Sequence, residues 1–232
     1  GNYHPRTTRF YTDFGLLTSN PEIGDDVNEV FKQLTGLGKA TALKHLWQAP
    51  FSLHSNMLAS IRGEIDAALA GKPARIIAKM NSLLEPEIIE ALYEASSAGV
   101  SIDLIVRGVC SLRPGIKGLS ENIRVRSVIG RFLEHHRIFY FHADGRQNIY
   151  LSSADWMERN FFRRIEISFP VLEPKLKQRV LKEGLKPYLA DNCQAWEMNG
   201  DGEYLIKPSR RNRSSAQELL LADLGVSVVS VT

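Results

Sequence analysis

The sequence has only two cysteines and no apolar run long enough to cross a membrane. Cys110 and Cys193 lie far apart and form no C-x-x-C pair, which predicts two free thiols and a reducing compartment. A membrane-spanning helix needs about 18 consecutive apolar residues, so no span is expected. The chain begins at Gly1 with neither an initiator methionine nor an apolar leader, so we expect a piece of a longer protein.

A large excess of either charge is also lacking. Lysine and arginine number 29 against 26 aspartate and glutamate, which gives a net charge of +3. This mild excess argues against a specific nucleic-acid partner but permits a local anion site. Hydrophobic residues make up 44% and charged residues 24%, which is typical of a globular protein and excludes a mostly disordered chain.

Hydrophobic spacing predicts an α/β fold with a mixed β-sheet flanked by helices. Helices are expected from Asn20-Pro21 to about Gly36, over 58–69, from Pro86 to 95, and from Pro174 to about Leu189. Strands are expected at 74–79, 102–106, 123–129, 137–141, 148–151 and 164–169. The order strand, helix, strand over 74–106 indicates a βαβ unit. Ala143-Asp144-Gly145 predicts a hairpin turn, and the glycine-containing stretch Thr35–Ala42 is the candidate domain junction.

The residues richest in chemistry lie in Leu133–Tyr140 and Tyr150–Asn160. Strand alternation places His135 and Arg137 on one face and His136 on the other. An imidazole can exchange a proton with a phosphoryl group or attack it, and a guanidinium neutralises phosphate oxygens. This pattern is weak alone, and two histidines making ordinary hydrogen bonds are the alternative.

The string Leu133-Glu134-His135-His136-Arg137 resembles the second phospholipase-D-like motif of bacterial polyphosphate kinases, the type that autophosphorylates on histidine. The blocks Asn2–Asp13, Ala78–Leu83, Leu104–Leu112 and Ser153–Met157 are also similar to this family, in the family's order. The resemblance covers essentially the whole chain and implies a phospholipase-D-like α/β fold. It also implies that residues 1–45 are the C-terminal remnant of a first such domain and that residues 46–232 form the second.

The resemblance implies an enzyme that transfers the terminal phosphate of ATP reversibly to polyphosphate through a phosphohistidine. The family's phosphorylated histidine and its Mg²⁺ ligands precede the matching region, so we expect no metal site in this chain and no activity from the chain alone. ATP or ADP and polyphosphate are the expected partners. A homo-oligomeric parent and a cytoplasmic location, with peripheral membrane association left open, complete these expectations.

Individual roles follow from the matching blocks. The residues that match the family's nucleotide-contacting positions are Tyr11, Arg107 and His135. His135 and Arg137 are the candidate catalytic pair. Further candidate contacts to phosphate or polyphosphate are Lys79, Asn81 and Arg159, together with Arg210 and Arg211 in a basic loop.

Each candidate has an ordinary structural alternative. Tyr11 can be a core aromatic, Arg107 a surface arginine, and Lys79 an edge-exposed or ion-paired lysine. Asp155 can cap a turn or orient a catalytic histidine. The cationic helix stripe Lys175, Arg179, Lys182 and Lys186 can be solvated or bind a polyanion, and His45, His54 and His142 are expected to be structural or solvent-facing.

Two other functions compete with the kinase. A phospholipase-D-like phosphodiesterase or nuclease would use paired H-x-K motifs, whereas this chain has H-x-R at His135 and no second such motif. A non-catalytic polyanion-binding module is the third interpretation.

Overall fold

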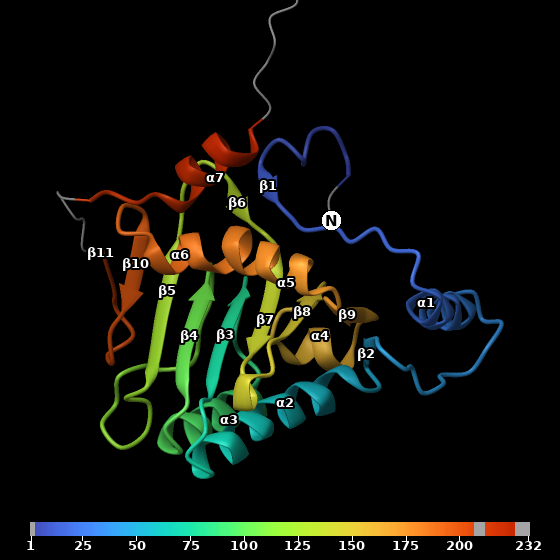
Figure 1. The fold of residues 1–232 in the computed structure, drawn as a ribbon, viewed down its shortest axis with the longest axis horizontal. Helices are drawn as coiled ribbons and strands as arrows, with labels where there is room; N and C mark the ends of the chain where they lie inside the picture. Colours follow the sequence, from blue (N-terminus) through green and yellow to red (C-terminus); the bar gives the residue numbers. More distant parts are fainter. Residues whose placement is uncertain (1–2, 207–211, 226–232) are drawn as a thin grey trace, which may run out of the picture.

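The apolar runs that follow Lys72 and Gly99 form two parallel strands at the centre of a mixed β-sheet (Figure 1). The computed structural model describes residues 3–206 and 212–225, and within them the sheet order is β11-β10-β5-β4-β3-β7-β8-β9-β2. β1 and β6 form a separate parallel pair. The strands are β1 Tyr11–Thr12, β2 Trp47–Ala49, β3 Arg75–Met80, β4 Ser101–Val106, β5 Ile123–Val128, β6 Leu133–Glu134, β7 Arg137–Phe141, β8 Asn148–Ser152, β9 Glu166–Pro170, β10 Ala195–Met198 and β11 Tyr204–Ile206.

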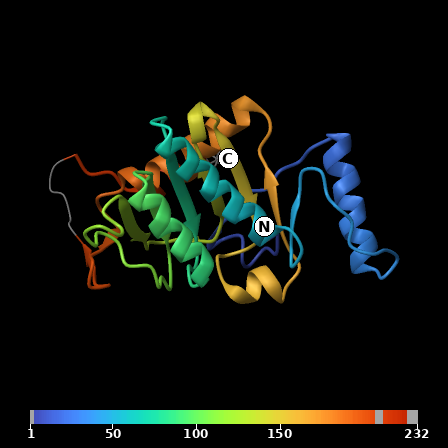
Figure 2. The ribbon, with the colours of Figure 1, turned by 90° about the horizontal axis from the view of Figure 1, so that it is seen from below.

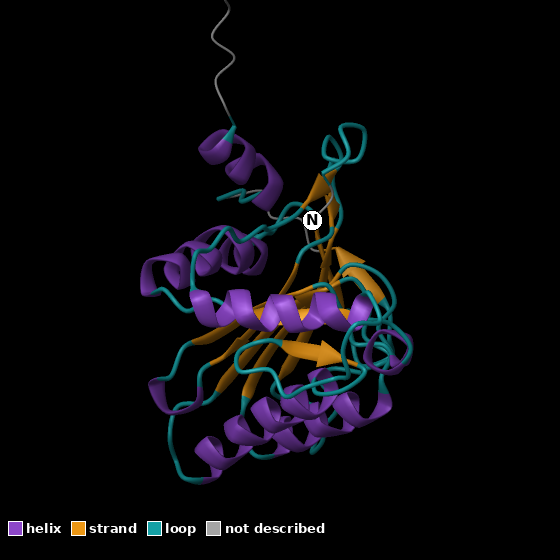
Figure 3. Ribbon diagram, turned by 90° about the vertical axis from the view of Figure 1, so that its right-hand side faces the viewer, coloured by secondary structure: helices purple, strands orange, loops and turns teal. Residues whose placement is uncertain are grey.

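Helices cover both faces of this sheet, as the side view in Figure 3 shows. α2 and α3 lie on one face, and α5 and α6 lie on the other (Figure 1). The helices are α1 Pro21–Leu34, α2 Leu53–Leu69, α3 Pro86–Ser97, α4 Glu158–Phe162, α5 Pro174–Val180, α6 Lys186–Ala190 and α7 Ala216–Leu224. α1 stands to one side of the sheet (Figures 1 and 2). Among the described residues no helix is long and apolar enough to cross a bilayer.

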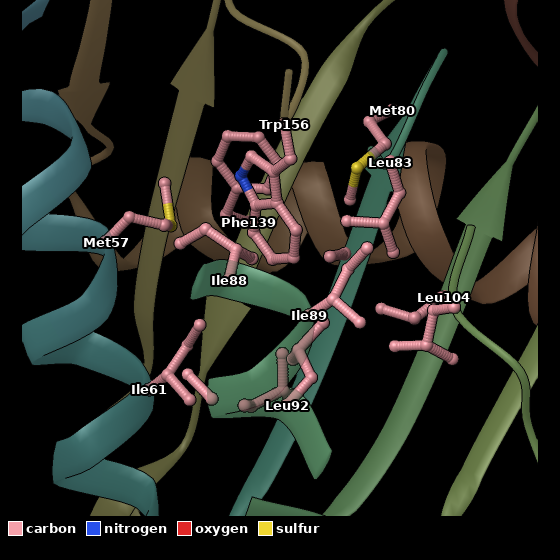
Figure 4. Packing of buried hydrophobic residues seen from close by; sticks show 14 of the residues in the cluster. Met57, Ile61, Met80, Leu83, Ile88, Ile89, Leu92, Leu104, Phe139 and Trp156 are labelled. Atoms are coloured by element: carbon pink, nitrogen blue, oxygen red, sulfur yellow. The ribbon is translucent and has the colours of Figure 1, made fainter. Parts of the chain in front are cut away.

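The larger hydrophobic core fills the space between the sheet and the helices α2 and α3 (Figure 4). Trp156 and Phe139 stack at its centre with ring centroids 4.9 Å apart, and both side chains are fully buried. A second apolar cluster packs the other face of the sheet against α5 and α6 through Ile138 and Leu185. Apolar side chains therefore pack against both faces of β3 and β4.

Most of the predicted elements are confirmed with small shifts of their ends. Asn20 caps α1, β3-α3-β4 is a parallel βαβ unit, and β7 and β8 form the predicted hairpin. Asp144 takes a φ of 53° in its turn, a left-handed conformation that aspartate tolerates better than most residues. Cys110 and Cys193 are free, as expected.

The helix predicted over 174–189 is correct in extent but contains a π-helical turn at Leu181–Leu185. A Cβ on Gly184 would collide with Ile138 and come within 3.0 Å of Phe14, so the turn needs glycine for close packing. The strand expected at 164–169 begins two residues later, at Glu166. The sequence analysis missed α4 and the short strands β1, β2, β6, β10 and β11.

Asp26 attaches α1 to the segment that leads into β2. Its carboxylate accepts hydrogen bonds from the backbone N–H groups of Lys44, His45 and Leu46 at 2.9, 2.6 and 2.9 Å. Burial by itself would raise the pKa of Asp26, but these three donors outweigh burial and hold the pKa below 3.8, its ordinary value. The charged carboxylate therefore stabilises this attachment.

We predict that Asp26→Asn lowers the free energy of unfolding by about 2 kcal/mol, because an amide NH₂ would face backbone donors. The folded pKa is the lower one, so the contribution is present above pH 3.8 and lost as the pH falls through the folded value. Urea unfolding of the 232-residue chain at pH 7 and pH 3 measures it. Asp25→Asn, at the exposed neighbouring position, is the matched control and should change little. Equal stability of the two variants would contradict this assignment.

Candidate functional site

The short β1–β6 pair lies beyond the carboxyl ends of β3 and β4 (Figure 1). Its register places Tyr11 opposite Leu133 and Thr12 opposite Glu134. The carbonyl of Thr12 accepts from the backbone N–H groups of His135 and His136 at 3.2 and 3.1 Å. Because side chains alternate along a strand, this pairing creates two faces with different contents.

One face carries His135 between two residues of the N-terminal segment. Its Nδ1 lies 2.9 Å from Oδ1 of Asp13, and its ring meets that of Tyr11 edge-on, with centroids 5.1 Å apart. The side chain of His135 is 27% exposed, so a ligand can reach it. Tyr11 and Asp13 therefore set the orientation of an accessible imidazole.

Arg137 lies beside this imidazole and is held by Asp155. Its Nε and Nη2 donate to the two carboxylate oxygens of Asp155 at 3.1 and 2.9 Å. Its Nη1 donates to the His135 carbonyl at 2.9 Å and lies 3.2 Å from Nε2 of the same residue. Oδ1 of Asp155 also accepts from the backbone N–H of Asn81 at 2.7 Å. A bidentate pair of this kind fixes the guanidinium plane.

Arg107 comes directly after β4 and adds a second guanidinium to the site. Burial is the main cause that lowers the pKa of Arg107; the carboxylate of Asp155 opposes this, and the positive charge of Arg137 adds to it. Nη1 of Arg107 and Oδ1 of Asn81 are buried and have no hydrogen-bond partner among the described residues. Buried polar atoms without partners are rare, and a bound ligand is one common reason for them.

The opposite face of the β1–β6 pair contains buried charges. Lys79 is 2% exposed, and its Nζ lies 2.7 Å from Oε2 of Glu134 and 2.7 Å from Nε2 of His136. Burial lowers the pKa of Lys79 to about 7, although the charge of Glu134 opposes this. Burial, followed by the charge of Lys79, lowers the pKa of His136 to about 3. His136 is therefore a neutral, buried hydrogen-bonding residue.

The predicted site residues thus separate into groups. The structure brings together Tyr11, Asn81, Arg107, His135 and Arg137. Lys79 lies apart from them in the buried cluster. Arg159 is exposed, and Arg210 and Arg211 lie outside the described residues.

The remaining basic and histidine candidates are structural or exposed. The cationic side chains of the stripe along the helix over 174–189 face solvent, and Arg179 pairs with Glu183 at 2.7 Å. His45 pairs with Glu22, His54 with Glu85, and His142 contacts the hydroxyl of Tyr140. Asp155 orients Arg137 rather than a histidine.

The sequence analysis did not single out Asp13, Glu134 or Gln217. Alternation along Tyr11-Thr12-Asp13 was an available signal for Asp13, because it places Tyr11 and Asp13 on one face. No local pattern indicated Gln217, whose Nε2 donates to Oε1 of Glu134 at 2.7 Å from far along the chain.

The accessible face has the chemistry of an anion site. Arg107 and Arg137 supply positive charge and planar donor groups, and His135 supplies an imidazole that can exchange a proton with a phosphoryl group. Asp155 makes its ion pair with Arg137, and Nη1 of Arg107 has no partner among the described residues, so its N–H groups can bind an anion. Such a site suits phosphate oxygens.

Comparison with protein families gives two matches. The family model described as "Polyphosphate kinase C-terminal domain 2" matches residues 46–217. The model described as "Polyphosphate kinase C-terminal domain 1" matches residues 1–40.

Individual relatives agree with these matches. The polyphosphate kinase of Burkholderia multivorans is 63% identical over 96% of this chain, and that of Paraburkholderia phytofirmans is 59% identical over 95%. This chain spans 32% of the length of either protein. The crystal structure of the polyphosphate kinase from Porphyromonas gingivalis has a TM-score of 0.92 and 36% identity, over 97% of this chain and 34% of that one. The expected mixed α/β fold is thereby confirmed, and the chain belongs to the polyphosphate kinase C-terminal domain family.

Proposed function

We propose that this chain is the C-terminal part of an enzyme that transfers the terminal phosphate of ATP reversibly to polyphosphate. The observation that carries the proposal is the convergence of Arg107, Arg137 and His135 on one accessible face, with Nη1 of Arg107 buried and unpaired among the described residues. The family membership of the chain supports the same activity. The chain spans about a third of its relatives, so the rest of the active site would come from the remainder of the enzyme.

In this proposal the reaction has two phosphoryl transfers. The bond between the γ-phosphorus of ATP and its bridging oxygen breaks as a histidine nitrogen outside this chain bonds to phosphorus, and ADP leaves. A terminal oxygen of polyphosphate then attacks the phosphohistidine and releases the histidine. Arg107 and Arg137 neutralise the phosphoryl oxygens, and His135 holds the proton that the leaving oxygen needs.

Mg²⁺, which the family resemblance implies, does not fit the described residues as a resident ion. No group of three histidine, cysteine or carboxylate side chains is placed to bind a metal within residues 3–206 and 212–225. The carboxylate of Asp155 already accepts from Arg137 and Asn81. We propose that Mg²⁺ is held by residues outside this chain.

Three finer proposals accompany the activity. Residues 1–45 are the end of a first phospholipase-D-like domain and residues 46–232 are the second, which the break between the two family matches at 40 and 46 supports. The parent is a homo-oligomer in the cytoplasm. Tyr11 and Arg107 contact the nucleotide, and Asn81 contacts phosphate through its Nδ2 amide group, which has a second N–H besides the one that donates to the His135 carbonyl at 3.4 Å.

Transfer of label from γ-labelled ATP into acid-insoluble polyphosphate by the full-length parent protein tests this function. The same preparation is assayed for plasmid nicking, which a phosphodiesterase or nuclease would show. We expect polyphosphate synthesis and no nicking. Nicking without synthesis would overturn the proposed function.

The 232-residue chain alone is predicted to neither autophosphorylate nor make polyphosphate, because covalent catalysis has no first step without its nucleophile. Incubation with labelled ATP followed by neutral and acid gel analysis measures this. Acid-labile phosphate on any histidine of the isolated chain would contradict the placement of the nucleophile elsewhere.

Arg107→Lys in the full-length parent is predicted to lower kcat roughly a hundredfold, about 3 kcal/mol, because lysine keeps the charge but loses the planar fork of donors. Steady-state kinetics with ATP and polyphosphate give the result. Arg124→Lys, at an exposed position on β5, is the matched control and should keep its activity. Equal turnover of both variants would make Arg107 an ordinary surface residue.

His135→Gln and His136→Gln are predicted to fail in different ways. The first should lower kcat on the order of a hundredfold, since a positioned acid or base is lost, with the urea midpoint nearly unchanged. The second should lower the free energy of unfolding by about 2 kcal/mol, because it disturbs a buried hydrogen-bonding cluster. If His136→Gln instead lowered kcat and His135→Gln lowered the stability, the two faces of the β1–β6 pair would be the reverse of those described.

A further inference from the structure

The Lys79 ammonium is surrounded inside the protein by a carboxylate, an imidazole and an aromatic ring. Its Nζ lies 2.7 Å from Oε2 of Glu134, 2.7 Å from Nε2 of His136 and 3.0 Å from the centroid of the Tyr188 ring. An ammonium has three donors and no more. At 2% exposure, Lys79 would have to break one of these contacts to bind a phosphate oxygen.

Lys79, Glu134, His136 and Tyr188 form a buried cluster, and Glu134 connects it to residues near both ends of the described chain. Its Oε2 also accepts from the hydroxyl of Thr12 at 2.9 Å, and its Oε1 accepts from Nε2 of Gln217 at 2.7 Å. Thr12 belongs to β1 and Gln217 to α7. One lysine–glutamate pair thus connects the central strand β3 to β6, β1 and α7.

The strands that this cluster joins cannot fix their own register firmly. β1 and β6 are two residues each, and only two residue pairs face each other. A slip of one residue would exchange the faces, moving Tyr11 and Asp13 away from His135. The contact of Thr12 with Glu134 and His136 opposes such a slip, because it is made only in the observed register.

We propose that Lys79 is a positioning residue for the site: from the back of the β1–β6 pair it holds Glu134 and Thr12, and thereby the placement of Tyr11 and Asp13 against His135. It is not a phosphate contact. This inference rests on the proposed function for its kinetic test, and on the chain alone for its spectroscopic test.

The kinetic test compares Lys79→Met, Glu134→Gln and the double variant in the full-length parent. Each single variant leaves a buried charge or its hydrogen-bonding partners uncompensated, whereas the double variant is neutral, and the amide that replaces the Glu134 carboxylate can still bond Thr12 and Gln217. We expect Lys79→Met to lower kcat on the order of a hundredfold, as misplacement of a reacting group does, with KM for ATP little changed. The double variant should recover at least tenfold of that loss.

A phosphate-binding role for Lys79 gives a different pattern. The double variant would then be as inactive as Lys79→Met, and KM for ATP would rise in both. That pattern, or unchanged turnover of Lys79→Met, would overturn the inference. Lys72→Met, which removes an exposed lysine paired with Asp144 at the far end of β3, is the matched control and should behave as wild type.

The spectroscopic test uses the 232-residue chain and needs no activity. The imidazole Cε1–H signal of His135, assigned by its loss in His135→Gln, reports the neighbouring Tyr11 ring. We expect the signal to shift in Lys79→Met and return in the double variant. If the wild-type parent makes no polyphosphate, the proposed function fails, and this signal still decides the role of Lys79.

Thr12→Val keeps the test decisive where Lys79→Met does not fold. It removes one hydroxyl from the cluster and leaves Lys79 and Glu134 intact. The positioning role predicts a shifted His135 signal and a loss of roughly tenfold in kcat, the size of one hydrogen bond to a charged group. An unshifted signal with unchanged kcat would overturn the inference.

Discussion

A ladder of only two residue pairs joins β1 to β6, and the contacts of Tyr11 and Asp13 with His135 depend on its register. Tyr11, Asp13 and His135 share one face of this ladder, whereas Thr12, Glu134 and His136 share the other. The first face is accessible and lies beside two guanidiniums, whereas Glu134 and His136 on the second face are buried. The buried ion pair is thus the support of the accessible imidazole.

The cations on the two faces of the β1–β6 pair differ in their partners. The ammonium of Lys79 contacts Glu134 and His136, so its charge stabilises the folded protein and does not bind a ligand. Arg137 is clamped by Asp155 but keeps N–H groups beside His135, and Arg107 keeps an unpaired buried nitrogen among the described residues. A guanidinium has five N–H donors, so an arginine held by a carboxylate still has donors for a ligand. An ammonium has only three, and two of those of Lys79 are used inside the protein.

Local patterns in the sequence predicted much of this arrangement. The Asn20-Pro21 helix start, the βαβ unit and the Asp144-Gly145 turn follow from short-range rules, and alternation separated His135 from His136 correctly. Lys79 was different: its partner Glu134 is 55 positions away, and Gln217 is another 83 beyond. Whether a lysine is buried depends on such distant partners. The sequence therefore could not decide whether Lys79 is exposed, ion-paired or a phosphate contact.

The most direct measurement is a crystal structure of the full-length parent with a non-hydrolysable ATP analogue. We predict phosphate oxygens within hydrogen-bonding distance of Nη1 of Arg107 and of the His135 ring, with Lys79 still bonded to Glu134 and His136. A phosphate oxygen on Nζ of Lys79, or an analogue bound away from the His135 face, would contradict the two-faced account of the β1–β6 pair.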